Sequence, residues 1–364
     1  MLKSKKMFLF LALLLTFCIV LAGCSGGSSE SSTNAKNETE ENNDNSNNEV
    51  EAEPEDKTFE LNFSTASVPN DAHTEGLYVL KNSIEEKTDG QVTVNIHHSG
   101  SLYTQENESN ALRRGHLEMA YTGAEWLAEE LSFLSMFTSA YLYEDYDHMT
   151  SVLNGEIGED VFDQIAEELG IRPLGAFYLG ARHINYRDIG KEIRTPEDMK
   201  GVTLRMPGSP TWLFVGKAMG ATATPVDFSE LYMALNTGTV DAQDNPLPTV
   251  KNASFYEVTD YVSLTNHIVA SVWPTINEDV WVEMGEELQG KMMEAVEEAR
   301  EFVDQTNLTA EQEVIDFLKG EGLEIIEPDV QAFSEHVQQQ YLDSEEMSST
   351  WDMDLFDRIK EMAE

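Results

Sequence analysis

Two polar side chains in this chain of 364 residues are suited to holding an anion. Arg205 lies in the Leu-Arg-Met-Pro string of residues 204–207, at the end of a strand expected over 202–206. A guanidinium offers a planar fork of donors that matches a carboxylate, and it stays charged when water is removed. Asn245 lies in the Asp-Ala-Gln-Asp-Asn-Pro string of residues 241–246, whose composition is typical of a turn. Its amide both donates and accepts, so it can bind a carboxylate oxygen or a neighbouring substituent.

Four further side chains lie near the ends of expected elements. Trp212 follows the Pro-Gly-Ser-Pro string of residues 207–210, where its indole can stack on a sugar or an aromatic ring, or pack inside the protein. Phe228 begins an expected helix and either lines the same pocket or belongs to the core. His73 and Glu75 follow the first expected strand, where they can reach a distal hydroxyl of a ligand. A helix cap or a surface position is the alternative for His73.

Motifs of catalytic sites are missing from the sequence. It contains no Gly-x-Ser-x-Gly elbow, no His-Glu-x-x-His, no Gly-x-Gly-x-x-Gly and no phosphate loop. His97 and His98 are adjacent, which directs their rings to opposite faces of a strand and suits no single metal ion. We therefore expect a protein that binds its ligand without converting it, and that needs no cofactor or metal.

The elements that must position these side chains form two similar α/β segments. In the first, strands are expected over 58–64, 92–96 and 117–121, with helices over 73–88 and 106–114. This β-α-β-α-β order predicts a lobe with a largely parallel sheet.

The same order begins again after Thr195, which has the features of a helix cap. Strands are expected over 202–206 and 224–226, with a helix over 210–219 between them. Asp227 and Glu230 have capping-box spacing for a further helix that ends at Gly238.

A long strand and a long helix complete the pattern. Residues 261–276 are rich in Val, Ile, Thr and aromatic residues, and apolar residues then recur at helical spacing over 288–317. A single helix there would be about 45–50 Å long, at about 1.5 Å per residue. The alternative is two helices broken near Asn307, and Gly290 and Thr306 are the weak points. Two lobes and a connecting helix predict a cleft, with ligand contacts at the carboxyl ends of strands.

Residues 228–267, together with Arg205 upstream, resemble the signature region of the solute-binding subunits of tripartite ATP-independent periplasmic (TRAP) transporters, the DctP family. The resemblance implies an α/β fold of the two-lobed periplasmic-binding-protein-like type II class, with a cleft between the lobes and a long connecting helix. The family layout places 57–179 plus 270–310 in the first lobe. It places 180–269 plus 311–364 in the second.

The resemblance also implies roles for the polar residues. In the family, the arginine that matches Arg205 makes a two-pronged ion pair with the ligand carboxylate. The one that matches Arg182 approaches the same carboxylate or closes over it, and a hinge salt bridge is its alternative. Asn245 matches a family asparagine, although Ala242 and Asp244 replace the usual glycine and glutamate.

The ligand implied is a small organic acid. Gly208 stands where sialic-acid-binding relatives have asparagine, which argues against sialate. A sugar acid such as a uronate, an aromatic acid and a four-carbon dicarboxylate all stay open.

The family partners are two integral membrane subunits, one small and one large, driven by a sodium gradient, and we expect the receptor to be a monomer. Three alternatives remain from the sequence. The chain can be a receptor for an ATP-driven importer or a sensor kinase, an extracellular lipoprotein hydrolase, or a structural surface lipoprotein.

The N-terminal residues have the pattern of a secretion signal. A lysine-rich start and an apolar run lead to the Leu-Ala-Gly-Cys string of residues 21–24, which predicts a signal peptide over 1–23 and lipidation of Cys24. An ordinary signal peptide with a chance cysteine is the alternative. Residues 24–56 contain almost nothing apolar and predict a disordered tether. The expected location is therefore outside the cytoplasm, anchored by lipid to the cell membrane.

The charge balance excludes some partners. The formal net charge is −44, with 67 Asp and Glu against 23 Lys and Arg. Nucleic acid and anionic membrane surfaces are therefore poor partners, and an anionic ligand must be held by specific local groups. We interpret the acidity as an adaptation to high salt or high pH, where a charged surface preserves solubility.

Overall fold

The computed structural model describes residues 57–363. The signal peptide expected over 1–23, Cys24 and the tether expected over 24–56 lie outside the described residues. Within the described part, no helix is both long enough and apolar enough to cross a membrane.

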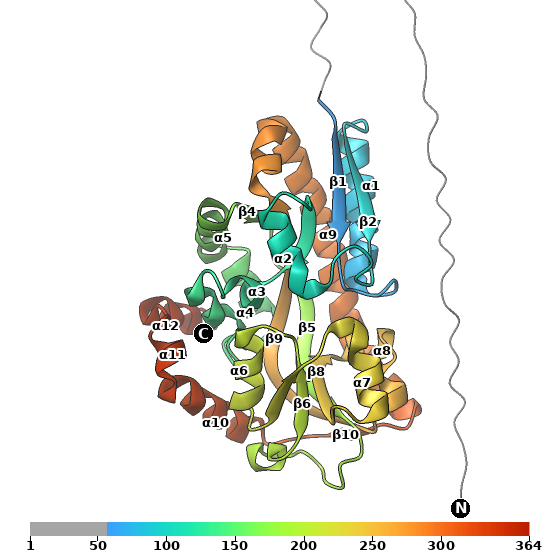
Figure 1. Ribbon diagram of the computed structural model, residues 1–364, viewed down its shortest axis with the longest axis vertical. Helices are drawn as coiled ribbons and strands as arrows, with labels where there is room; N and C mark the ends of the chain where they lie inside the picture. The colour runs from blue at the N-terminus through green and yellow to red at the C-terminus, as the bar shows by residue number, and fades with distance from the viewer. Residues whose placement is uncertain (1–56, 364) are drawn as a thin grey trace, which may run out of the picture. The chain divides into compact units, whose positions relative to one another are not determined.

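The first part of the described chain alternates strands and helices (Figure 1). Its elements are β1 (Phe59–Ser64), α1 (Ala72–Lys87), β2 (Val92–His97), α2 (Gln105–Arg113), β3 (Met119–Thr122), α3 (Ala124–Leu127), the 3-10 helix η1 (Ser132–Thr138), α4 (Tyr146–Leu153), α5 (Glu156–Leu169) and β4 (Ile171–Pro173). β1 pairs in parallel with both β2 and β3, and its alternating Phe59, Leu61 and Phe63 side chains are buried. The expected β-α-β-α-β order is confirmed.

The second part repeats this alternation. Its elements are β5 (Phe177–Tyr186), η2 (Pro196–Met199), β6 (Thr203–Met206), α6 (Pro210–Ala218), β7 (Thr222–Pro225), η3 (Phe228–Glu230), α7 (Leu231–Thr237), β8 (Ala242–Pro246), α8 (Leu247–Asn252) and η4 (Phe255–Val258). The capping box at Thr195 is present, although it begins a short 3-10 helix. The predicted box at Asp227 is wrong: its carboxylate accepts from the backbone N–H of Ser229 at 2.8 Å, within the short turn η3.

The remaining elements return across the molecule. They are β9 (Tyr261–Asn277), α9 (Glu278–Gly320), β10 (Glu324–Ile326), α10 (Val330–Asp343), α11 (Glu345–Ser348) and α12 (Met353–Glu361). The strands form one sheet in the order β2-β1-β3-β9-β5-β8-β6-β7, and β4 and β10 also pair with β9. β9 is antiparallel to β3 near its end and to β5 along most of its length. These two long strands therefore carry the sheet from one lobe into the other.

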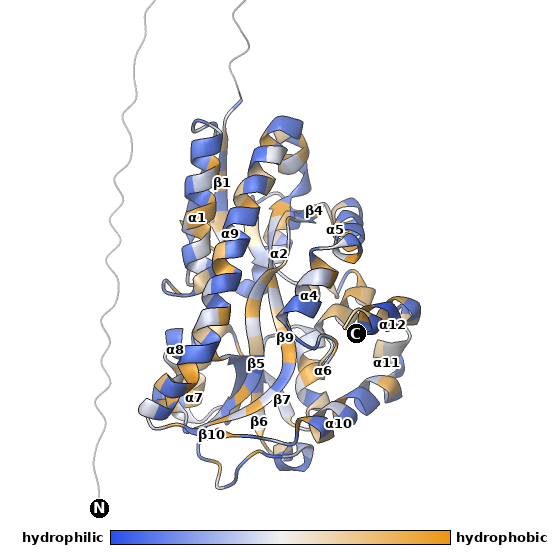
Figure 2. Ribbon diagram, turned by 180° about the vertical axis from the view of Figure 1, so that it is seen from behind, coloured by the Kyte–Doolittle hydropathy of each residue, from blue (hydrophilic) through white to orange (hydrophobic). Residues whose placement is uncertain are grey.

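The helix α9 continues through Asn307, as the single-helix prediction required. It contacts α1, β5 and α8, and Figure 2 shows it running past α1 toward α8 with hydrophilic residues on its outer side. Its one interruption is at Gly285 (φ 72°, ψ 163°), rather than at the weak points expected at Gly290 and Thr306. Glycine adopts this conformation without steric cost because it has no Cβ.

The string at residues 241–246 is not a turn, which corrects the sequence prediction. Its last five residues form β8, and all five are buried. β8 is antiparallel to β5 and parallel to β6. Its polar side chains find partners inside the sheet, because Gln243 Nε2 donates to Asn185 Oδ1 at 3.1 Å and Asn245 Nδ2 donates to Gln243 Oε1 at 2.6 Å. Hydrogen bonds to neighbouring strands override the local turn preference.

A buried carboxyl group joins the entry of α1 to the end of α8. Asp71 is 5% exposed, and its Oδ1 accepts from Asn252 Nδ2 at 2.9 Å. Burial raises the pKa of Asp71 from 3.8 to about 6, although hydrogen bonds from Asn252 and from the backbone of Val68 favour the ionised form. The folded protein therefore binds the Asp71 proton more tightly than the unfolded chain does.

We expect the free energy of unfolding to fall as pH rises from about 4 to about 6, because over this range the folded state holds more protons. Asp71→Asn should remove this slope and stabilise the protein at pH 7 by about 1–3 kcal/mol. Urea unfolding of both proteins at pH 4, 5, 6 and 7 measures the effect. Asp316→Asn on the exposed side of α9 removes the same formal charge and should leave the slope unchanged. Equal slopes in native and Asp71→Asn protein would contradict the assignment.

Candidate functional site

Arg205 lies where three strand ends meet. β6 is parallel to β7 and to β8, so the carboxyl ends of all three lie at one edge of the sheet. Arg205 is the third of the four residues of β6, and it is 1% exposed. The sequence prediction of an arginine at a strand end is confirmed, and this edge is where α/β folds bind ligands.

The Arg205 guanidinium is only partly satisfied by the protein. Its Nε donates to the backbone carbonyl of Val226 at 2.8 Å, and its Cζ lies 6.0 Å from the centre of the Phe228 ring. Within residues 57–363 its two terminal amino groups have no hydrogen-bond acceptor, and no carboxylate forms an ion pair with it. Burial lowers the pKa of Arg205 to about 10, opposed by the charge of Asp244, so the group remains cationic at neutral pH. A buried, half-paired cation favours an incoming anion.

Arg182, in contrast, already has a carboxylate partner. Its Nε donates to Asp244 Oδ2 at 2.9 Å, and both side chains are buried. Asp244 also receives a contact of 3.1 Å from His267 Nε2. Burial opposes ionisation of Asp244, but the charge of Arg182 and the hydrogen bond from His267 hold its pKa below the usual range. The structural alternative for Arg182, a salt bridge, is therefore observed, and a direct role toward ligand stays a prediction.

The other predicted residues fall into two groups. Trp212 and Asn245 surround Arg182: the Arg182 Cζ lies 4.4 Å from the indole centre, and Arg182 Nη2 donates to Asn245 Oδ1 at 3.2 Å. Phe228 lies beside Arg205. The structure thus brings five predicted residues together.

His73 and Glu75 are not part of this group within the described residues. His73 is buried, with its ring edge-on to Tyr121 at 5.9 Å and its Nε2 at 3.5 Å from Asn307 Nδ2 on α9. Burial lowers the pKa of His73 to about 4, so its ring is neutral at physiological pH. Glu75 is exposed. The helix-cap and surface alternatives for His73 are wrong, because Asp71 precedes the helix and the ring packs inside.

Three acidic residues in this region were missed from the sequence: the charges of Glu106 and Asp227 act on Arg205, and Glu108 interacts with the charge of Asp227. Glu106 and Glu108 lie on α2, and Asp227 follows β7. Glu108 is 1% exposed and accepts from Ser64 Oγ at 2.8 Å; burial raises its pKa to about 8, and the charge of Asp227 adds to the rise. The available signal was their place after the expected strands over 92–96 and 224–226.

A cavity of about 260 Å³ lies beside Asp227 and Phe228, and Arg205, Glu106 and Glu108 are not among the residues that line it. It is lined by Ala66, Val68, Ser99, Gly100, Thr104 and Gln105 from the first lobe and by Asp227, Phe228, Ser229, Tyr232, Ala253 and Phe255 from the second. A hollow of this size admits a small organic molecule.

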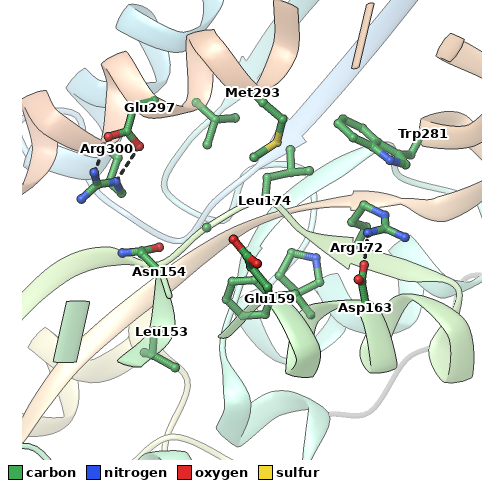
Figure 3. Close-up of a pocket in the computed structure, with 14 residues that line it drawn as sticks. Leu153, Asn154, Glu159, Asp163, Arg172, Leu174, Trp281, Met293, Glu297 and Arg300 are labelled. Atoms are coloured by element: carbon green, nitrogen blue, oxygen red, sulfur yellow. Dashed lines mark hydrogen bonds and ion pairs between the residues drawn. The ribbon is translucent and has the colours of Figure 1, made fainter. Parts of the chain in front are cut away.

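A wider hollow, of about 350 Å³, lies elsewhere, among α5, β4 and α9 (Figure 3). Its arginines are already paired: Arg172 donates to Asp163 at 2.7 Å and Arg300 Nε donates to Glu297 at 2.9 Å. Since these charges have protein partners, the hollow lacks the half-paired cation that marks the Arg205 region.

Comparison with known proteins identifies the family of this chain. The family model "Bacterial extracellular solute-binding protein, family 7" (DctP) matches residues 63–347. The chain is 30% identical over 263 residues to the sialic acid-binding periplasmic protein of Vibrio cholerae, which covers 72% of this chain and 81% of that protein. It is 32% identical over 246 residues to a solute-binding protein of Roseobacter denitrificans, covering 68% and 74%.

Solved structures give the same result. A TRAP periplasmic solute-binding protein from Roseobacter denitrificans with bound 3-deoxy-D-manno-oct-2-ulosonic acid is 38% identical, with a TM-score of 0.80, over 84% of this chain and 100% of that chain. Another from the same organism, with bound L-galactonate, is 27% identical with a TM-score of 0.77, over 85% and 99%. The chain therefore belongs to family 7 of the bacterial extracellular solute-binding proteins, the DctP family, and has its two-lobed fold.

Proposed function

We propose that this protein is an extracytoplasmic receptor that captures a small organic acid through Arg205 and delivers it to a TRAP-type transporter. The single observation that carries the proposal is the buried Arg205 guanidinium with two unpaired amino groups at the carboxyl end of β6. The ligands of relatives support a sugar acid, because the two similar structures hold 3-deoxy-D-manno-oct-2-ulosonic acid and L-galactonate. The 2,3-diketo-L-gulonate-binding periplasmic protein of Escherichia coli is 28% identical over 263 residues.

The mechanism needs no chemical change in the ligand. Arg205 orients the carboxylate with paired hydrogen bonds, and Asn245 and Arg182 complete its surroundings, with Phe228 and Trp212 as apolar walls. Closure of the lobes removes water from the ion pair, which strengthens the electrostatic attraction. The ligand shifts the protein toward the closed state by its higher affinity for that state. His73 and Glu75 would act only at a distal end of a longer ligand.

We place the lobe boundaries where the chain passes from one lobe to the other three times: between residues 179 and 180, between 269 and 270, and near 310/311. The contacts of three elements support this placement. Gly180 and Ala270 are direct partners in the β5–β9 ladder, which has an irregularity between Tyr178 and Gly180. On α9, Glu311 Oε1 accepts from the backbone N–H of Ala181 at 2.6 Å. These contacts bring residues beside the three proposed crossings close together, which supports a hinge at this position.

A thermal-shift screen of the purified protein tests the function. Organic acids that fill the site should raise the melting temperature in a concentration-dependent way, because a ligand that binds only the folded state stabilises it. The methyl ester of the same acid has no carboxylate and is the matched control. A larger shift with the ester than with the acid, or recovery of a chemically altered ligand, would overturn the proposal.

The membrane partners follow from family membership: one small and one large integral membrane subunit. A receptor for an ATP-driven importer is the second candidate. Uptake assays in reconstituted vesicles separate the two, since TRAP transport should require a sodium gradient and should continue without ATP.

Lipid attachment at Cys24 is a further proposal, supported by the Leu-Ala-Gly-Cys string at residues 21–24. A single acyl chain gives only weak, reversible membrane binding, whereas two or more chains on Cys24 would anchor the protein stably. In membrane fractionation, we expect the native protein to sediment with membranes and Cys24→Ala to be released after processing. Equal membrane association of the two would contradict the proposal.

A further inference from the structure

The space around Arg205 has an unequal charge balance. Arg182 is neutralised by Asp244 at 2.9 Å, so Arg205 is the cation there without an ion-pair partner in residues 57–363. The charges of Glu106 and Asp227 act on Arg205, and Glu108 in turn interacts with the charge of Asp227.

Glu106 belongs to α2 in the first lobe, and its side chain reaches Gly208 in the second. Its carboxylate lies against Gly208, three residues beyond Arg205, so closely that a Cβ added at residue 208 would collide with it. The Glu106 side chain is exposed, and within the described residues it makes no ion pair. Its oxygens are therefore free to accept hydrogen bonds at the mouth of the site.

Glu108 is the deeper of the two. It is 1% exposed, and Ser64 Oγ donates to its Oε1 at 2.8 Å, while its Oε2 has no hydrogen bond in the described part of the chain. A ligand hydroxyl can therefore form a hydrogen bond with this oxygen. Burial, with a smaller contribution from the charge of Asp227, raises the pKa of Glu108 to about 8, so its carboxyl group is mostly protonated and neutral at pH 7.

Asp227 completes this acidic side from the second lobe. Its Oδ1 accepts from the N–H and the Oγ of Ser229, at 2.8 and 2.6 Å. Its Oδ2 has no partner within residues 57–363. Asp227 also lines the 260 Å³ cavity, next to Phe228.

We infer that the site selects a hydroxyl-rich monocarboxylate and rejects an acid with a second carboxylate at its far end. The inference rests on the proposed function, in which Arg205 binds the first carboxylate. Ligand hydroxyl groups can donate to the free oxygens of Glu106 and Asp227, and the neutral carboxyl group of Glu108 can donate or accept. A second carboxylate would meet the like charges of Glu106 and Asp227 with no cation to compensate it, and such juxtaposition strongly disfavours binding.

Matched pairs of sugar acids test this. Gluconate and glucarate, and galactonate and galactarate, differ only in whether carbon 6 is a hydroxymethyl group or a carboxylate, and threonate and tartrate are a shorter pair that differ in the same way at carbon 4. By calorimetry on the purified protein, the monocarboxylate of each pair that binds should bind at least about 100-fold more tightly. In Glu106→Gln/Asp227→Asn protein, which lacks both repelling charges, this ratio should fall below about tenfold. Glu313→Gln/Asp316→Asn, on exposed positions of α9, removes the same formal charge and should keep the native ratio.

The outcomes separate this inference from the proposed function. A dicarboxylate that binds as tightly as its partner, with Arg205-dependent affinity, overturns the inference and leaves the carboxylate receptor standing. An unchanged ratio in the Glu106→Gln/Asp227→Asn protein also overturns it. If no acid of any pair binds, and none in the thermal-shift screen does, both conclusions fail.

Discussion

Arg205→Lys is expected to weaken binding of the cognate acid by about thirtyfold to several thousandfold. Lysine keeps the charge but lacks the planar fork and the Nε–H that now donates to Val226 at 2.8 Å. Leaving a desolvated carboxylate imperfectly paired costs about 2–5 kcal/mol, by analogy with truncated charge pairs at interfaces, which gives the stated range. Calorimetry with the acid identified by thermal shift measures the loss.

The apo protein should keep its fold, because the Arg205 side chain makes one hydrogen bond, to Val226, and forms no ion pair within the described residues. An unfolding scan without ligand checks this. Arg194→Lys is the matched control: Arg194 lies in the same lobe, is 53% exposed and pairs with Glu192 at the surface. It should bind the acid as the native protein does. Native affinity in Arg205→Lys would remove Arg205 from the site, and an unfolded variant would make its role structural.

Asp244→Ala is expected to lower the free energy of unfolding by about 3–5 kcal/mol. The change leaves the Arg182 guanidinium, 4% exposed, without its carboxylate, and also removes the partner of His267 at 3.1 Å. An uncompensated buried charge is strongly destabilising, more so than the loss of the pair as a whole. Urea denaturation at pH 7 measures the effect.

Two further variants sharpen this test. Arg182→Met/Asp244→Leu removes both charges and should recover much of the lost stability, since no isolated charge remains. Glu192→Ala breaks the exposed Arg194–Glu192 pair, with side chains 53% and 42% exposed, and should cost less than about 1 kcal/mol. If Asp244→Ala costs no more than Glu192→Ala, the buried pair is not a structural requirement. Loss of ligand binding at unchanged stability would instead give Arg182 a direct role.

Local patterns were enough to place most elements. The alternation of Phe59, Leu61 and Phe63, and the Gly stop at Gly238, act within a few residues of chain, so the sequence alone predicts β1 and the end of α7. The position of Arg205 at a strand end was also predictable, because the residues that flank Arg205 define the end of β6. The helix α9 was predicted from its apolar spacing, but its interruption at Gly285 was not, since isolated glycines also occur in straight helices.

What the sequence left undecided depends on contacts between distant segments. Residues 242–246 have the composition of a turn, yet they form a buried strand because β5 and β6 supply partners on both sides. Arg182 has the chemistry of a ligand-binding residue, but a carboxylate 62 positions later neutralises it. Glu106 gains its position from Gly208 in the other lobe. Hydrophobic periodicity and helix caps depend on residues close together in the sequence, so they can be recognised from it. The pairing of charges depends on which strand ends the tertiary fold brings together, and the sequence alone does not show this.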